Sequence, residues 1–89
     1  MKIVDGFRLR EIMGQKTIIG EGVGQVNFNK LITLNDSAAY LWQSVEGKEF
    51  DVLLLSDLLV EKYGIEPSVA VRDVQSIVDK WIEVGVVIK

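Results

Sequence analysis

Residues 34–47 read LNDSAAYLWQSVEG, and this segment passes abruptly from an apolar strand to a compact helix. Asn35, Asp36 and Ser37 are each suited to begin the helix, because their short polar side chains accept hydrogen bonds from its first free N–H groups. The alanines and leucine that follow favour helix, and Gly47 is expected to end it. Residues at i, i+3, i+4 and i+7 give this helix one apolar face: Ala38, Leu41, Trp42 and Val45. We therefore predict a strand that ends at Leu34 and a buried helix directly after it.

Extended chain is expected on the N-terminal side of this helix. Residues 7–13 (FRLREIM) mostly alternate between apolar and polar, which is the period-2 pattern of a half-buried strand. Gly14-Gln15 is predicted as the two-residue connection of a hairpin, and residues 16–20 (KTIIG) as its return strand. A third strand is predicted over residues 29–34, where Leu, Ile, Thr and Leu follow one another.

Glycines occupy positions 20, 22 and 24, between the second and third predicted strands. A glycine-rich loop can cradle phosphate, but such a loop opens a helix and carries a Lys-Ser or Lys-Thr pair. Neither feature follows Gly24, so we interpret the segment as a connection between strands.

The second predicted helix has clear signals at both ends. Asp51 is suited to cap its first turn, and Gly64 follows Tyr63 as a C-terminal stop. At about 100° per residue, the core face of this helix comprises Val52, Leu55, Leu58, Leu59 and Tyr63. Leu53 and Val60 fall on the opposite side, as either scattered exposed side chains or a patch for self-association.

The third predicted helix begins near Pro67, which suits a first turn, and stops at Gly85. Its apolar residues span about 160° of the helical wheel, whereas a core-facing stripe needs roughly 100°. They are Ala70, Val71, Val74, Ile77, Val78, Trp81, Ile82 and Val84. One margin of this wide face is therefore available to line a groove, unless both margins contact the rest of the domain. The C-terminal sequence VVIK is expected to add a short final strand.

Length and element order define the fold class. A chain of 89 residues holds one hydrophobic core, so residues 1–89 are interpreted as a single domain. Three strands followed by three helices predict an α+β fold, in which a three-stranded antiparallel sheet packs on the helices.

Composition excludes most kinds of chemistry. The chain has no cysteine and no histidine, which rules out disulfides and thiolate metal sites and removes the commonest general base. Asp36 and Asp51 flank predicted helices, and four further carboxylates lie on polar helix faces: Glu61, Asp73, Asp79 and Glu83. The sequence contains no calcium loop and no catalytic triad. We therefore predict a protein that is not an enzyme and uses neither a cofactor nor a metal.

Charge and hydropathy limit the possible partners. The net charge of −3 disfavours nucleic acid, because affinity for phosphates depends on Lys and Arg. No apolar run reaches about 18 residues, so no membrane span is expected. Charges interrupt the N-terminal sequence MKIVDGFRLREIMG, which is not a signal peptide. We expect a cytoplasmic protein.

Three segments together resemble the PqqD family, which is named for coenzyme PQQ synthesis protein D. They are FRLREIMGQKTIIGEG (7–22), LITLNDSAAYLWQSVEG (31–47) and EKYGIEPSVAVRDVQSIVDKWIEVGVV (61–87). The likeness lies in the charged hairpin entry, in the capped aromatic helix closed by glycine, and in the Pro-opened last helix with its Asp-Val pair. Together the three segments extend over nearly the whole chain, and their order and spacing add to the resemblance.

The resemblance implies a winged-helix-like fold and a role as a peptide chaperone in natural product biosynthesis. Family members bind the leader of a ribosomally made precursor peptide and present it to a modifying enzyme, often a radical SAM enzyme with iron–sulfur clusters. The leader adds a strand beside the third strand and lies against the third helix. The strand edge then corresponds to Lys30, Leu31, Ile32 and Thr33. The facing wall corresponds to Val71, Val74, Val78 and Ile82, with Gln75 and Asp79 at its rim.

Two alternatives compete with this interpretation. A winged-helix DNA-binding domain has a similar topology, and its third helix would contact DNA. The charged residues of that helix here are Arg72, Asp73, Asp79, Lys80 and Glu83. This excess of carboxylates would repel a phosphate backbone. The second alternative is an adaptor that forms a homodimer, either through Leu53 and Val60 or by exchange of its N-terminal strands.

Overall fold

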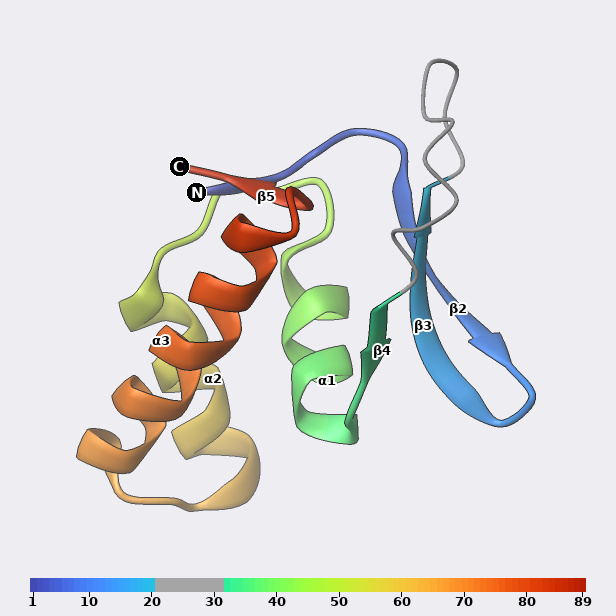
Figure 1. Cartoon of the computed structure of the whole chain (residues 1–89). Coiled ribbons are helices and arrows are strands. Elements are labelled where there is room, and N and C mark those ends of the chain that lie inside the picture. Colours follow the sequence, from blue (N-terminus) through green and yellow to red (C-terminus); the bar gives the residue numbers. More distant parts are fainter. Residues whose placement is uncertain (21–31) are drawn as a thin grey trace.

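The computed structural model describes residues 1–20 and 32–89, and Figure 1 shows the arrangement of their elements. The strands are β1 (Lys2–Ile3), β2 (Phe7–Ile12), β3 (Gln15–Gly20), β4 (Ile32–Leu34) and β5 (Val87–Ile88). The helices are α1 (Asp36–Val45), α2 (Val52–Tyr63) and α3 (Pro67–Glu83). The predicted α+β order, with a three-stranded antiparallel sheet followed by three helices, is confirmed. The glycine connection, Lys30, Leu31 and the start of the third predicted strand lie outside the described residues.

The three-stranded sheet has the order β2–β3–β4. Leu9 pairs with Ile18, which pairs in turn with Ile32, so these three side chains share one face of the sheet. Ile18 is fully buried, and the other two are partly buried against the core. This apolar face is what joins the sheet to the rest of the molecule.

The hairpin between β2 and β3 turns one residue earlier than the sequence predicts. Ile12 pairs with Gln15, so Met13 and Gly14 form the connection rather than Gly14 and Gln15. Both connecting residues have positive φ, 52° for Met13 and 79° for Gly14. Two positive φ values characterise a type I′ turn, whose twist matches that of the flanking strands. Gly14 adopts a positive φ without steric cost, which favours the turn at this position. A positive φ is unusual for a residue with a side chain such as Met13.

A second, two-stranded sheet joins β1 to β5, with Ile3 opposite Val87. The expected C-terminal strand is therefore confirmed. Its partner β1 was not predicted, because a strand of two residues is too short to show an alternating pattern.

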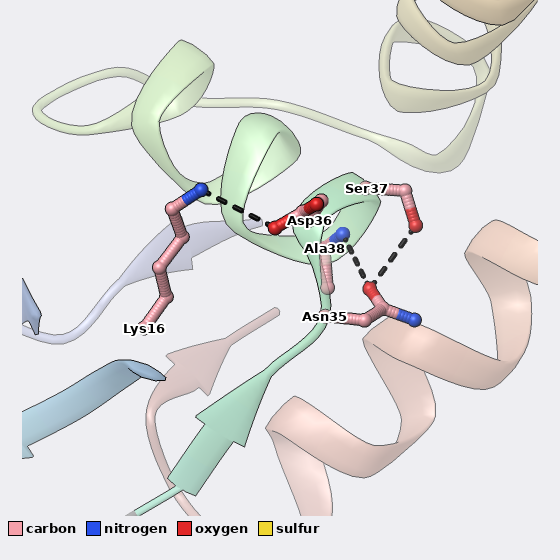
Figure 2. Close-up of polar contacts among 5 residues, drawn as sticks. All are labelled: Lys16, Asn35, Asp36, Ser37 and Ala38. Atoms are coloured by element: carbon pink, nitrogen blue, oxygen red, sulfur yellow. Dashed lines mark hydrogen bonds and ion pairs between the residues drawn. The ribbon is translucent and has the colours of Figure 1, made fainter. Parts of the chain in front are cut away.

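The start of α1 confirms the predicted cap and selects one of its three candidates. Figure 2 shows the Ala38 N–H donating to Asn35 Oδ1 at 2.9 Å, with the Ser37 hydroxyl donating to the same oxygen at 3.1 Å. Lys16 on β3 forms an ion pair of 3.3 Å with Asp36. The cap sets where the helix begins, and the ion pair ties that point to the sheet.

The ends of α2 and α3 also follow their sequence signals. Asp51 Oδ1 accepts a hydrogen bond from the Leu54 N–H at 2.8 Å, and Gly64 ends α2 in the left-handed conformation. Pro67 lies in the first turn of α3. After α3, the Gly85 N–H donates to Ile82 O at 3.1 Å and the Val86 N–H donates to Trp81 O at 3.0 Å. These two bonds form a Schellman motif, which turns the chain into β5.

The predicted core faces of α1 and α2 are largely as observed. All four face residues of α1 are buried: Ala38, Leu41, Trp42 and Val45. On α2, Leu55 and Leu59 are buried and Val52 and Leu58 are half-buried, but Tyr63, which was predicted on the same face, is 45% exposed at the end of the helix. Leu53 is 67% exposed, as expected for the opposite side. Val60 was expected on the exposed side too, but it is half-buried against the core. The core therefore contacts α2 over a wider arc than the single predicted stripe.

Candidate functional site

Strand β4 has one paired edge and one edge without a partner strand in the described part of the chain. It pairs with β3 on one side, and α3 lies on its other side, as Figure 2 shows. The strand runs directly into the capped start of α1, so its position is fixed at its C-terminal end. The described part of this strand is thus held between the sheet and a helix, and no described strand satisfies the backbone groups along its second edge.

A hollow of about 290 Å³ opens between this strand and α3. Its lining residues come from β4, from the start of α1 and from α3: Ile32, Thr33, Leu34, Asn35, Ala38, Ser76, Ile77, Lys80 and Trp81. The apolar side chains among them outnumber the polar ones, and they come from all three elements. A hollow of this kind suits an apolar group carried by a ligand that lies along β4.

The residues from α3 form two rows, because side chains four apart lie on the same side of a helix. Ile77 and Trp81 form the inner row, where Trp81 is buried and Ile77 half-buried. Ser76 and Lys80 form the outer row, and both are exposed. The hollow therefore has an apolar floor and a polar rim on its helical side.

The floor of the hollow is supported by the core. The indole of Trp81 contacts the indole of Trp42 on α1 edge to face, with ring centroids 5.3 Å apart. Trp42 is fully buried, and its Nε1–H has no hydrogen-bond acceptor among the described residues. Edge-to-face pairs of this kind are stabilised by their quadrupoles as well as by burial. The floor is therefore fixed before any ligand is present.

The structure places the predicted site residues unequally. Ile32 and Thr33 line the hollow, as the sequence suggested for the strand edge. Val74 and Val78 are 0% and 1% exposed, so their side chains belong to the core. Val71, another residue of the predicted wall, is 39% exposed but does not line the hollow.

The predicted rim also faces elsewhere. Gln75 Nε2 donates to Asp79 Oδ1 at 2.8 Å, and both side chains are exposed. At about 100° per residue they point away from the row of Ile77 and Trp81. Ile82 is half-buried against the core and is likewise absent from the lining. The margin of α3 that borders β4 is thus the one that contains Ile77. The sequence did not single out Ile77, and its only indication was the wide apolar arc of the helix.

The possible self-association patch is smaller than expected. Leu53 is 67% exposed and Leu54 is 42% exposed, at the start of α2. Val60 does not join them at the surface, because it packs against the core. The patch is therefore limited to one turn of α2.

Residues 1–20 and 32–89 contain no group of three or more Asp, Glu, His or Cys side chains that could hold a metal ion. No described helix combines the length and the hydropathy that crossing a membrane requires.

Comparison with known proteins points to one family. The family model described as coenzyme PQQ synthesis protein D (PqqD) matches residues 13–87. This range includes β4, the hollow beside it and α3. No curated protein and no solved structure matches the chain.

Proposed function

The chain belongs to the PqqD family, whose members are non-catalytic, peptide-binding partners in PQQ synthesis, and we propose that it binds the leader of a ribosomally made precursor peptide by strand addition to β4. The proposal extends to a single domain over residues 1–89 that works in the cytoplasm. The observation that carries it is the edge of β4 that has no partner strand among residues 1–20 and 32–89 and that lies beside the apolar hollow.

Backbone pairing would align the guest with β4. An edge strand presents N–H and C=O groups that an extended peptide can satisfy without regard to its sequence. Each such hydrogen bond contributes a net stabilisation of about 1 kcal/mol. Within the described part of the chain β4 comprises Ile32–Leu34, and the backbone of these three residues provides few of them.

Side-chain burial would decide which guests bind. Alternate side chains of an added strand point to the same face, so one of them can enter the hollow beside α3. Full burial of a Leu or Phe side chain contributes about 1.5–3 kcal/mol, which exceeds the net value of a single hydrogen bond. The hollow lined by Ile77 and Trp81 is therefore the main source of selectivity, and β4 sets the direction of the guest.

The bound leader would then be presented to a modifying enzyme. A chain of this family supplies no chemistry itself, so its contribution is to raise the local concentration of the precursor at its partner. We propose a radical SAM enzyme as that partner, in keeping with the family. Precursor and partner enzyme would occupy different faces, because the leader fills the side between β4 and α3.

Nuclear magnetic resonance tests the proposal. Synthetic leader segments of short precursors encoded near the gene would be titrated into ¹⁵N-labelled protein, with scrambled leaders as controls. We expect one leader to shift the amides of Ile32–Leu34 and of residues 77–81, while its scrambled form does not. Shifts confined to Leu53 and Leu54 would contradict strand addition and favour an adaptor that binds through α2.

A further inference from the structure

Lys80 is the charged residue of the hollow. The other described residues that line it are neutral: Ile32, Thr33, Leu34, Asn35, Ala38, Ser76, Ile77 and Trp81. The Lys80 side chain is exposed at the rim of α3, one turn after Ser76 and one residue before the buried Trp81. A cation thus stands directly beside the apolar floor.

Two carboxylates that adjoin lining residues in the sequence are engaged by other groups, and Glu83, three residues after Lys80 on α3, forms no ion pair with it. Asp36, at the start of α1, forms its ion pair with Lys16 at 3.3 Å. Asp79 accepts a hydrogen bond from Gln75 at 2.8 Å on the other side of α3. No ion pair joins Lys80 to a carboxylate of residues 1–20 or 32–89. The ammonium group of Lys80 is therefore available to a ligand.

We propose, on the basis of the function proposed above, that this site selects a guest in which a large apolar residue lies close to an Asp or Glu. The apolar side chain enters the hollow over Trp81, and the carboxylate pairs with Lys80 at the rim. Lys80 is thereby a specificity-determining residue, which discriminates between acidic and basic guests that bury the same apolar group.

The dimensions of the hollow agree with such a guest. A cavity of about 150 Å³ accommodates benzene, and this hollow measures about 290 Å³. A Leu, Ile or Phe side chain therefore fits, with the guest backbone alongside β4. Long-range attraction does not favour an acidic guest, because the chain carries a net charge of −3. Discrimination must come from the local contact with Lys80.

The expected effect is moderate and sensitive to salt. Exposed ion pairs change affinity by up to about fivefold, and charge-assisted hydrogen bonds at partly dry sites by more. We expect acidic guests to bind about three- to tenfold more tightly than basic ones. The screening length falls from about 10 Å at 0.1 M salt to about 3 Å at 1 M, so the preference should shrink over that range.

A set of synthetic peptides provides the probe. Each would be acetylated and amidated, about ten residues long and built from Thr and Gln, with one central Leu. A single Glu or a single Lys would occupy each of the positions near the Leu in turn. Amide shifts of the ¹⁵N-labelled protein would give the affinity of every peptide, at low and at high salt.

Two variants with the same change of charge complete the test. Lys80→Glu should reverse the preference, so that peptides with Lys bind more tightly than those with Glu. Lys48→Glu, at an exposed position that does not line the hollow, should leave the preference unchanged. Both variants lower the net charge equally, so a general charge effect would alter them alike.

The outcomes separate this inference from the proposed function. Glu and Lys peptides that shift the amides of Ile32–Leu34 with equal affinity would overturn the role of Lys80 and leave strand addition intact. A preference that Lys80→Glu and Lys48→Glu change to the same extent would also overturn it. Peptides that shift no amide of β4 would contradict both proposals.

Discussion

Trp42 and Trp81 meet edge to face, with ring centroids 5.3 Å apart and ring planes at 89°. Trp42 comes from α1, and Trp81 comes from the margin of α3 that borders the hollow. One contact thus belongs to both the core and the floor of the candidate site. A substitution of either tryptophan should therefore lower the stability of the domain and alter the floor of the hollow.

The first prediction concerns the stability provided by this pair. Trp42→Ala should lower the free energy of unfolding by about 3–5 kcal/mol, because it leaves a large cavity in a fully buried position. Trp42→Phe should cost less than half as much, because it retains an aromatic ring and removes an N–H that has no acceptor among the described residues. Urea denaturation measures both values. Leu53→Ala, at an exposed position, is the control and should stay within about 0.5 kcal/mol of the parent.

The second prediction concerns the cap of α1. Asn35→Ala should lower the free energy of unfolding by about 1 kcal/mol, since the Ala38 N–H would lose its acceptor. For a domain of this size the melting temperature should fall by about 4–8 °C. Asp36→Ala should cost less, because its ion pair with Lys16 is largely exposed. An equal loss in the two variants would show that Asn35 is not the dominant cap.

The third prediction identifies the margin of α3 that contacts the leader. Ile77→Ala should weaken leader binding about five- to tenfold, because it removes apolar surface that borders the hollow. Val71→Ala makes a comparable truncation at an exposed position outside the lining and should leave affinity unchanged. Isothermal calorimetry with one leader peptide compares them. A larger loss in Val71→Ala would place the guest on the opposite margin.

The fourth prediction uses proline to test backbone pairing. Successive residues of a strand direct their N–H groups to opposite edges, so only one of Ile32 and Thr33 presents its N–H to the open side of β4. Of Ile32→Pro and Thr33→Pro, we expect one to abolish leader binding in a folded protein and the other to disturb the pairing with β3. Circular dichroism and calorimetry distinguish these effects.

Ile32→Val is the side-chain control for this experiment. It keeps the backbone donor and most of the apolar side chain, so affinity should change little. If neither folded proline variant loses more affinity than Ile32→Val, side chains rather than backbone groups of β4 hold the leader.

Element ends were the most predictable part of the fold. Asn35, Asp51, Gly64, Pro67 and Gly85 each act through hydrogen bonds or backbone conformations within a few residues, so the sequence contains all the information needed. The hairpin turn was placed one residue too late, because a non-glycine residue such as Met13 rarely adopts positive φ. The pairing of β1 with β5 joins distant segments and left no local signal.

The candidate site was only partly predictable for a related reason. A helical wheel showed that α3 is apolar over a wide arc, but its two margins looked equivalent. Which margin borders β4 depends on how α3 packs against α2 and β5, and that arrangement is tertiary. Val74 and Val78 were therefore assigned to the wall, although they are buried in the core, while Ile77 borders the hollow. The strand edge at Ile32 and Thr33 could be proposed from the strand alone, and both residues line the hollow.

Amide hydrogen exchange within β4 decides whether the leader adds a strand. The exchange rates of Ile32, Thr33 and Leu34 would be measured with and without a saturating leader peptide. An amide on the open edge should exchange freely in the unbound protein and become protected on binding, because it gains a backbone acceptor. A leader that binds while every amide of β4 exchanges at its unbound rate would contradict strand addition.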